Sequence, residues 1–202
     1  MKNFVLASSN EHKKEEYNKI LEKLNINFLS LKDKNIYVEA IEDGKTFEEN
    51  AYKKARFYKN LVSEAVIADD SGLVIDELPD ILGIYSSRFM EGSPYIKKCN
   101  EVLKRLEGKA NRNARFVCCI CLILENDETY IFKGVVEGTI GFKYEGTHGF
   151  GYDPIFIPNG FDNTLGIISE DIKNKISHRA QAAKKLKQFL MEGVKTYEDI
   201  TY

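Results

Sequence analysis

The most informative stretch of the chain is Ala65-Val66-Ile67-Ala68-Asp69-Asp70-Ser71-Gly72-Leu73-Val74-Ile75-Asp76, in which two short apolar runs flank a polar cluster. The runs are rich in β-branched residues and predict strands, whereas Asp-Asp-Ser-Gly is typical of a turn that ends a strand. Adjacent carboxylates at the end of a buried strand are costly unless a cation compensates them, and divalent cations prefer carboxylate oxygens. The alternative is a solvated turn whose side chains cap their own backbone. Both interpretations stay open at this point.

Length and composition are those of an ordinary water-soluble chain. Its 202 residues suffice for one large domain or two small lobes with a substantial core. A net charge of −2 argues against a general nucleic-acid binder, which normally carries a basic excess. The apolar run at residues 4–7 is too short for a signal peptide, and no run approaches transmembrane length. We therefore expect a cytoplasmic protein with no nucleic-acid or membrane partner.

The cysteines favour buried free thiols over a zinc site. Cys118, Cys119 and Cys121 lie in a single apolar run, whereas zinc clusters draw paired ligands from two separated places. Free thiols in a buried strand fit a reducing compartment.

A strand over residues 2–8 followed directly by a helix from Glu11 forms the first candidate site. Ser8-Ser9-Asn10 supplies the helix N-cap, and the exposed amide groups at such a helix start can hold a phosphate. Lys13-Lys14 add positive charge in the first turn, where it opposes the helix dipole unless an anion binds. The alternative is a pair of ordinary surface lysines.

An acidic loop precedes the next predicted helix, which begins near Thr46. Thr46 and Glu49 have capping-box spacing. The apolar positions of this helix recur with helical period and are Phe47, Ala51, Ala55, Tyr58 and Val62. Glu42 in the loop is either a plain surface acid or a second carboxylate for a metal ion.

The second half of the chain predicts a helix over 93–107, two strand-like runs at 114–125 and 129–140 joined as a hairpin, and a final helix over 178–191. The helix over 93–107 is expected to bury Tyr95, Ile96, Cys99, Val102, Leu103 and Leu106. With the first third, this order predicts a mixed α/β fold: a mixed sheet flanked by helices, with two lobes and a central cleft.

Two later segments carry groups suited to a nucleotide. The loop over 146–154 contains three glycines beside Phe150 and Tyr152, whose rings could face a planar base or could instead pack in the core. His178-Arg179 start the final helix, just after two lysines. Cations at a helix N-terminus oppose the helix dipole, so a ligand rich in hydrogen-bond acceptors would account for them.

Together these motifs resemble the inosine triphosphate pyrophosphatase family over nearly the whole chain. The matching segments, in family order, are Ser8–Lys13, Thr46–Ala51, Ala68–Leu73, Gly83–Phe89, Gly149–Phe156, and Lys173 with Ser177–Arg179. Two positions depart from the family pattern: Ser9 replaces the usual glycine of a Thr-Gly-Asn motif, and Leu82 stands where a proline is frequent. The resemblance implies a single pyrophosphatase domain over 1–202.

The resemblance also implies hydrolysis of non-standard purine nucleoside triphosphates (ITP, dITP, XTP) to the monophosphate and pyrophosphate, with Mg²⁺ and as a homodimer. Asp70 would be the general base and, with Glu42, would hold Mg²⁺, while Asp69 would assist indirectly. The groups implied for the triphosphate are Ser8, Ser9, Asn10, Glu11, His12, Lys13, Ser71 and Lys173. Those implied for the base are Phe150, Gly151, Tyr152, Asp153, His178 and Arg179.

Two other functions stay open. One is a pyrophosphatase for modified pyrimidine or methylated nucleotides, which a substrate panel would separate. The other is a catalytically silent nucleotide-binding module, against which the presence of both Asp70 and Lys173 argues.

Overall fold

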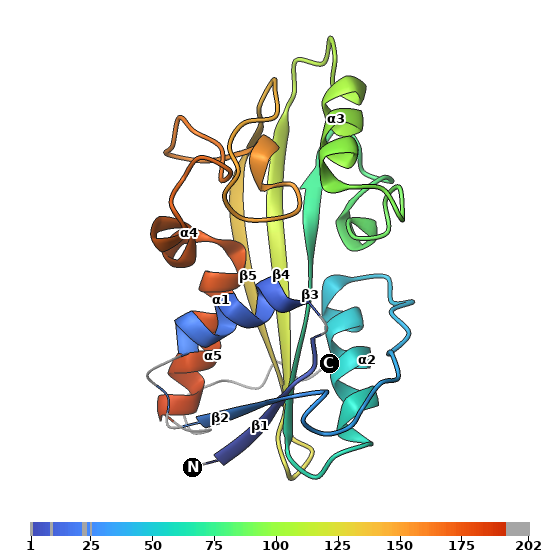
Figure 1. Cartoon of the computed structure of the whole chain (residues 1–202), viewed down its shortest axis with the longest axis vertical. Helices are drawn as coiled ribbons and strands as arrows, with labels where there is room; N and C mark the ends of the chain where they lie inside the picture. The colour runs from blue at the N-terminus through green and yellow to red at the C-terminus, as the bar shows by residue number, and fades with distance from the viewer. Residues whose placement is uncertain (1, 9, 22–23, 25, 193–202) are drawn as a thin grey trace. The chain divides into compact units, whose positions relative to one another are not determined.

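The computed structural model, which describes residues 2–8, 10–21, 24 and 26–192, contains a six-stranded sheet in the order β2-β1-β3-β4-β5-β6 (Figure 1). The strands are β1 (Lys2–Leu6), β2 (Ile26–Ser30), β3 (Ala65–Ile75), β4 (Asn113–Ile123), β5 (Thr129–Ile140) and β6 (Phe156–Pro158). The α-helices are α1 (Glu11–Leu21), α2 (Phe47–Lys59), α3 (Tyr95–Arg105), α4 (Glu170–Ile176) and α5 (His178–Glu192). β1 pairs in parallel with β2 and β3, whereas β5 and β6 are antiparallel, which confirms the predicted mixed α/β class.

The chain divides into two compact units. Unit 1 comprises Met1–Asp70, Cys118–Gly134 and Arg179–Tyr202, and unit 2 comprises Ser71–Val117 and Val135–His178. Strands β3, β4 and β5 each contribute residues to both units. Two units agree with the predicted two lobes, while the central cleft and the single domain over 1–202 stay predictions.

Helices cover the strands of unit 1. Side chains alternate in direction along a strand, so both faces carry apolar groups that must be buried. On one face, α1 and α5 lie side by side (Figure 1) and pack on the strands. This core contains Phe4, Leu6, Tyr17, Leu21, Ile67, Ile120, Leu186 and Phe189. The amphipathic helix α2 buries four of the five residues that its helical period predicted: Phe47, Ala51, Ala55 and Tyr58. The prediction for Val62 is wrong, because α2 ends at Lys59 and Val62 is only partly buried.

The polar cluster Asp69-Asp70-Ser71-Gly72 does not end a strand, so the predicted turn is wrong. β3 continues through it without interruption. The strand persists because both aspartates have compensating partners, described below, and because Gly72 allows a close backbone approach. A Cβ atom at Gly72 would lie 2.2 Å from the carbonyl oxygen of Gly83, so only glycine fits there.

Other element boundaries follow the predictions closely, with one error in burial. Helix α3 lies within the predicted 93–107, and its Cys99 is buried as expected. Tyr95 and Ile96, however, are 39% and 50% exposed, because the buried face of α3 starts only one turn later, at Lys98 and Cys99.

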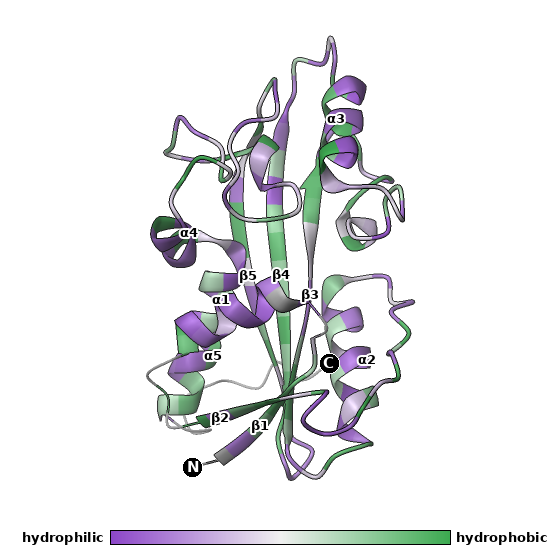
Figure 2. Ribbon diagram, viewed as in Figure 1, coloured by the Kyte–Doolittle hydropathy of each residue, from purple (hydrophilic) through white to green (hydrophobic). Residues whose placement is uncertain are grey.

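The hydropathy pattern agrees with the burial of β4. Figure 2 shows hydrophobic residues along the lower half of β4, where Cys118–Ile123 are fully buried. Among the helices that the structure describes, none is long and apolar enough to cross a membrane.

The four thiols are expected to be unreactive in the folded protein. All four cysteines are buried and free, which confirms the predicted thiols. Burial raises the pKa of Cys99, Cys118 and Cys121 to about 12, so that very little reactive thiolate forms at pH 8. With Ellman's reagent at pH 8 we expect no thiol to react within minutes in the native state and four equivalents to react at once in guanidinium chloride. Rapid release of even one native equivalent would contradict this.

Candidate functional site

Asp69 and Asp70 point to opposite faces of β3, because successive strand side chains alternate. Both are buried, at 2% and 7% exposure. Asp69 therefore lies on the face covered by α1 and α5, whereas Asp70 lies on the face of α2. The two adjacent carboxylates have different surroundings and can have different roles.

Asp69 is held as an anion by two cations. Its Oδ2 lies 3.0 Å from Lys13 Nζ and 3.4 Å from a terminal nitrogen of Arg179. Burial by itself would raise the pKa of Asp69, but the charges of Lys13 and Arg179 outweigh it and hold that pKa well below its usual value. Asp69 is thus a permanent negative charge that fixes two cations and is unsuited to accept a proton.

Arg179 completes a buried charge cluster. Its side chain is 1% exposed, and its guanidinium pairs with Glu16 of α1 as well as with Asp69. With Lys13, the cluster joins α1, β3 and α5 through two positive and two negative groups. In this conformation the guanidinium binds carboxylates, so its predicted place at the edge of the base stays a prediction.

Asp70 has the surroundings of a proton acceptor. Asn50 Nδ2 donates to Asp70 Oδ2 at 3.0 Å. Burial raises the pKa of Asp70 to about 6, and the nearby charge of Glu42 adds to the rise, while Lys54 and Asn50 oppose it. A carboxylate with a pKa near neutrality can take a proton from water more readily than an ordinary aspartate can.

Glu42 and Asp70 fit a divalent cation. Glu42 lies 2.5 Å from Lys54 Nζ, and its charge destabilises the charged form of Asp70, a repulsion that a cation would relieve. Mg²⁺ usually binds proteins through one or two carboxylates and takes its other oxygens from water and substrate phosphates. The described part of the chain contains no cluster of three or more His, Cys, Asp or Glu side chains that could hold a metal. The two carboxylates could hold a divalent cation only if water or a ligand supplied its remaining oxygens.

The start of α1 has the capped geometry that the sequence predicted. Asn10 Oδ1 accepts from the backbone N–H of Lys13 at 3.3 Å, and Ser8 Oγ accepts from that of Asn10 at 3.2 Å. Glu11 and His12 form the first residues of the helix. The prediction for Ser9 falls outside the described residues.

Unit 2 holds the predicted aromatic-glycine loop around one buried ion pair. Asp153 Oδ2 accepts from Lys173 Nζ at 2.7 Å and from the backbone N–H of Phe150 at 2.8 Å. A Cβ at Gly149, where φ is +72°, would lie 2.1 Å from that oxygen. Lys173 Nζ also lies 4.6 Å from the centre of the Phe150 ring. A cation and an aromatic face are thus presented together, next to Gly151.

Three further predicted residues of unit 2 are located as follows. Tyr152 is buried in the core, where its hydroxyl donates to the Ser86 carbonyl at 2.8 Å. His178 is also buried and stacks on Phe116 with ring centres 4.8 Å apart. Ser71 follows Asp70 directly in β3 and is partly buried. Of the two aromatic residues in the loop, Phe150 is therefore the more accessible to a base.

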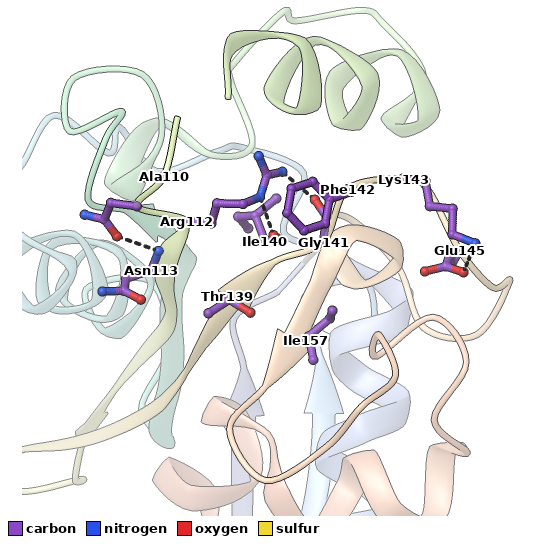
Figure 3. Close-up of a pocket in the computed structure, with 11 residues that line it drawn as sticks. Ala110, Arg112, Asn113, Thr139, Ile140, Gly141, Phe142, Lys143, Glu145 and Ile157 are labelled. Atoms are coloured by element: carbon purple, nitrogen blue, oxygen red, sulfur yellow. Dashed lines mark hydrogen bonds and ion pairs between the residues drawn. The ribbon is translucent and has the colours of Figure 1, made fainter. Parts of the chain in front are cut away.

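The pocket in Figure 3 is separate from the predicted residues. It has a volume of about 710 Å³ and is lined, among others, by Arg112, Ile140 and Phe142. The Arg112 guanidinium donates to the carbonyls of Leu106, Ile140 and Gly141 and lies 4.5 Å from the Phe142 ring centre. The Arg112 side chain therefore has a structural role, since it ties together the backbone at Leu106, Ile140 and Gly141.

The sequence analysis did not single out three residues that contact the predicted acids or Arg179: Asn50, Lys54 and Glu16. Asn50 and Lys54 lie one helical turn apart on α2, on the side that carries the buried alanines. Polar residues at that spacing on an apolar face were the available signal, because a buried polar group implies a partner. Glu16, on α1, gives no such signal in isolation.

Comparison with known proteins matches residues 4–189 to the model of the Ham1 family. A protein named dITP/XTP pyrophosphatase from Clostridium tetani is 40% identical over 94% of this chain and 96% of its own length. A protein of the same name from Bacillus subtilis is 42% identical over 94% and 98%. A solved HAM1 protein structure from Coxiella burnetii superposes with a TM-score of 0.89 at 37% identity, covering 96% of this chain and all of the other.

Proposed function

The chain belongs to the Ham1 family, and on this premise we propose that it is a nucleoside triphosphate pyrophosphatase that hydrolyses ITP, dITP and XTP to the monophosphate and pyrophosphate. Membership confirms the resemblance that the sequence motifs indicated. The observation that carries the proposal is the buried Asp70, whose carboxylate accepts from Asn50 and lies close enough to Glu42 and Lys54 for their charges to act on it. Removal of such triphosphates would keep them out of DNA and RNA.

Asp70 accepts the proton of the attacking water, and Glu42 and Asp70 would hold a Mg²⁺ ion. When bound, Mg²⁺ would polarise the phosphates and offset the charge on the departing pyrophosphate. Lys54 balances the two carboxylates before substrate arrives, since its ammonium pairs with Glu42 and donates to the carbonyl of Asp69 at 3.0 Å. Asp69 assists indirectly by fixing Lys13.

The triphosphate is positioned by the capped start of α1 and by basic side chains. The assigned residues are Ser8, Ser9, Asn10, Glu11, His12, Lys13, Ser71 and Lys173. Amide groups at a helix start and ammonium groups both favour phosphate oxygens. The base stacks on Phe150, with Gly151, Tyr152 and Asp153 forming the rest of its surroundings.

His178 and Arg179 supply donors that read the 6-oxo group of hypoxanthine or xanthine. The 6-amino group of adenine presents a donor at the same edge, so an unpaired polar contact disfavours ATP. Arg179 reaches the base only if its guanidinium gives up contacts with Glu16 and Asp69, which is a specific requirement of this proposal.

The test is pyrophosphate release from the four purine triphosphates ITP, XTP, GTP and ATP and from a modified pyrimidine and a methylated nucleoside triphosphate, each with Mg²⁺ and with EDTA. We expect strong Mg²⁺-dependent turnover of ITP and XTP and weak turnover of GTP and ATP. Equal turnover of all four would reject the purine selectivity, and turnover confined to modified pyrimidine or methylated nucleotides would support the alternative pyrophosphatase. No release from any substrate would favour a silent binding module.

We further assign the protein to a homodimer, on the family resemblance, and to the cytoplasm, because its free buried thiols fit a reducing compartment. Sedimentation equilibrium measures the assembly directly: a mass near twice 23.1 kDa supports the dimer, and a monomer mass rejects it.

A further inference from the structure

We propose that Asn50 is a positioning residue whose buried side-chain amide holds Asp70 and the Glu42 loop in the mutual arrangement needed to bind one divalent cation. This inference rests on the proposed function, because it assigns the two carboxylates to a metal ion. It concerns a residue that touches neither nucleotide nor metal in the assignment above.

The amide of Asn50 bridges two separate segments. Its side chain is fully buried; Nδ2 donates to Asp70 Oδ2 at 3.0 Å, and Oδ1 accepts from the backbone N–H of Gly44 at 2.7 Å. A backbone N–H can only donate, so the amide oxygen must face Gly44 and the NH₂ group must face the carboxylate. The orientation of the amide is therefore fixed by its partners, and both ends of the bridge are determined.

The loop end of the bridge needs a glycine. A Cβ on Gly44 would lie 2.7 Å from Asn50 Oδ1 and 2.9 Å from Glu49 Cβ, closer than such contacts allow. The next residues are fixed to α2 by two hydrogen bonds: Glu49 N–H donates to Oγ1 of the N-cap Thr46 at 3.1 Å, and Lys45 N–H donates to Glu49 Oε2 at 2.7 Å. Since Glu42 lies only two residues before Gly44, anchoring Gly44 limits where its carboxylate can go.

Such an anchor is needed because the two carboxylates repel each other. Lys54 offsets the charges of Glu42 and Asp70, but attraction between charges has little directional preference, whereas the two hydrogen bonds of an amide are directional. Asn50 contacts Asp70 directly and the Glu42 loop through Gly44. Ligands whose positions are set before binding lose less freedom when the ion binds.

The chain offers a matched control on the same helix and loop. Tyr58, on α2, donates from its hydroxyl to the carbonyl of Val38 at 3.1 Å and is 5% exposed. Tyr58→Phe removes one part-buried hydrogen bond between α2 and the loop and leaves the hydrogen bonds from Asn50 to Asp70 and from Gly44 to Asn50 in place. If Asn50 only fastened the loop, this control would have the same effect.

The experiment compares wild type, Asn50→Leu, Gly44→Ala and Tyr58→Phe. Mn²⁺ binding without nucleotide is measured from the electron paramagnetic resonance signal of the free ion, and the half-saturating Mg²⁺ concentration is measured in pyrophosphate release from ITP. Asn50→Leu keeps the approximate volume but neither hydrogen bond. We expect both constants to rise at least about tenfold in Asn50→Leu, to rise in Gly44→Ala, and to stay within about twofold in Tyr58→Phe.

Gly44→Ala keeps the inference testable should Asn50→Leu fail to fold, because residue 44 lies outside α2. Unchanged Mn²⁺ binding in a folded Asn50→Leu or Gly44→Ala protein would overturn the inference, as would an equal loss in Tyr58→Phe. The proposed function fails separately, if the wild type releases no pyrophosphate. Mn²⁺ binding by the wild type then still reports on Asn50.

Discussion

Asp70→Asn is expected to lower pyrophosphate release from ITP by about 10²–10⁴-fold, since an amide neither accepts the proton of the attacking water nor supplies an anionic oxygen to Mg²⁺. The change is nearly isosteric, and Asn50 can still donate to the remaining oxygen. The measurement is kcat at saturating ITP and Mg²⁺. The matched control is Asp76→Asn, which alters an aspartate just beyond the far end of β3 that pairs with Arg115 at 3.1 Å. It should keep activity within about twofold.

Stability provides a second readout for the same variant. In the folded protein the pKa of Asp70 is raised to about 6, above the unfolded value of about 3.9. Its contribution to stability is therefore fully present below pH 4 and is lost as the pH rises through 6. Asp70→Asn should thus gain stability relative to wild type between pH 4 and 7 in EDTA, measured by urea denaturation. A variant that is inactive because it is unfolded would show the opposite, and retained activity would remove Asp70 from the chemistry.

Local sequence patterns were sufficient to predict most of the fold. The period of α2 and its capping box predicted both its start and its buried face, because helix signals act over three or four residues. The apolar run of β4 was an equally clear signal for a buried strand. Its residues Cys118–Ile123 are all fully buried in the structure. Sequence reasoning failed at β3, where Asp-Asp-Ser-Gly has the composition of a turn. The strand continues there because partners distant in sequence, Lys13, Arg179 and Asn50, compensate the two carboxylates.

Sequence reasoning also missed the long-range contacts of the candidate site. Glu42 and Asp70 could be proposed from residue type and place in the sequence, but the contacts that set their properties could not. Asn50 lies 20 residues from Asp70 and Arg179 lies 110 residues from Asp69. Such pairs carry no local signal, so a single sequence identifies the acids and not the groups that tune them. The sequence likewise left undecided whether Tyr152 packs in the core. The structure shows it buried, with its hydroxyl donating to the backbone carbonyl of Ser86.

Arg179→Leu is expected to destabilise the protein by about 3–5 kcal/mol, because it removes the buried guanidinium that pairs with both Glu16 and Asp69. The free energy of unfolding in urea at pH 7 measures the loss. The control is Arg56→Leu, which removes a guanidinium from a more exposed pair with Asp127 and should cost at most about 1 kcal/mol.

Two further arms separate charge from packing in the Arg179 variant. Combining it with Glu16→Leu removes an opposite charge as well, so the double variant should recover at least about 1 kcal/mol of the loss. The pKa of Asp69 is depressed in the wild type, so its stabilising contribution exists above the unfolded value of about 3.9 and is lost on acidification. The gap between wild type and Arg179→Leu should therefore narrow from pH 7 to pH 3. If the gap is constant and the double variant shows no recovery, Arg179 stabilises the fold through its volume, and the charge cluster that joins α1, β3 and α5 contributes nothing of its own.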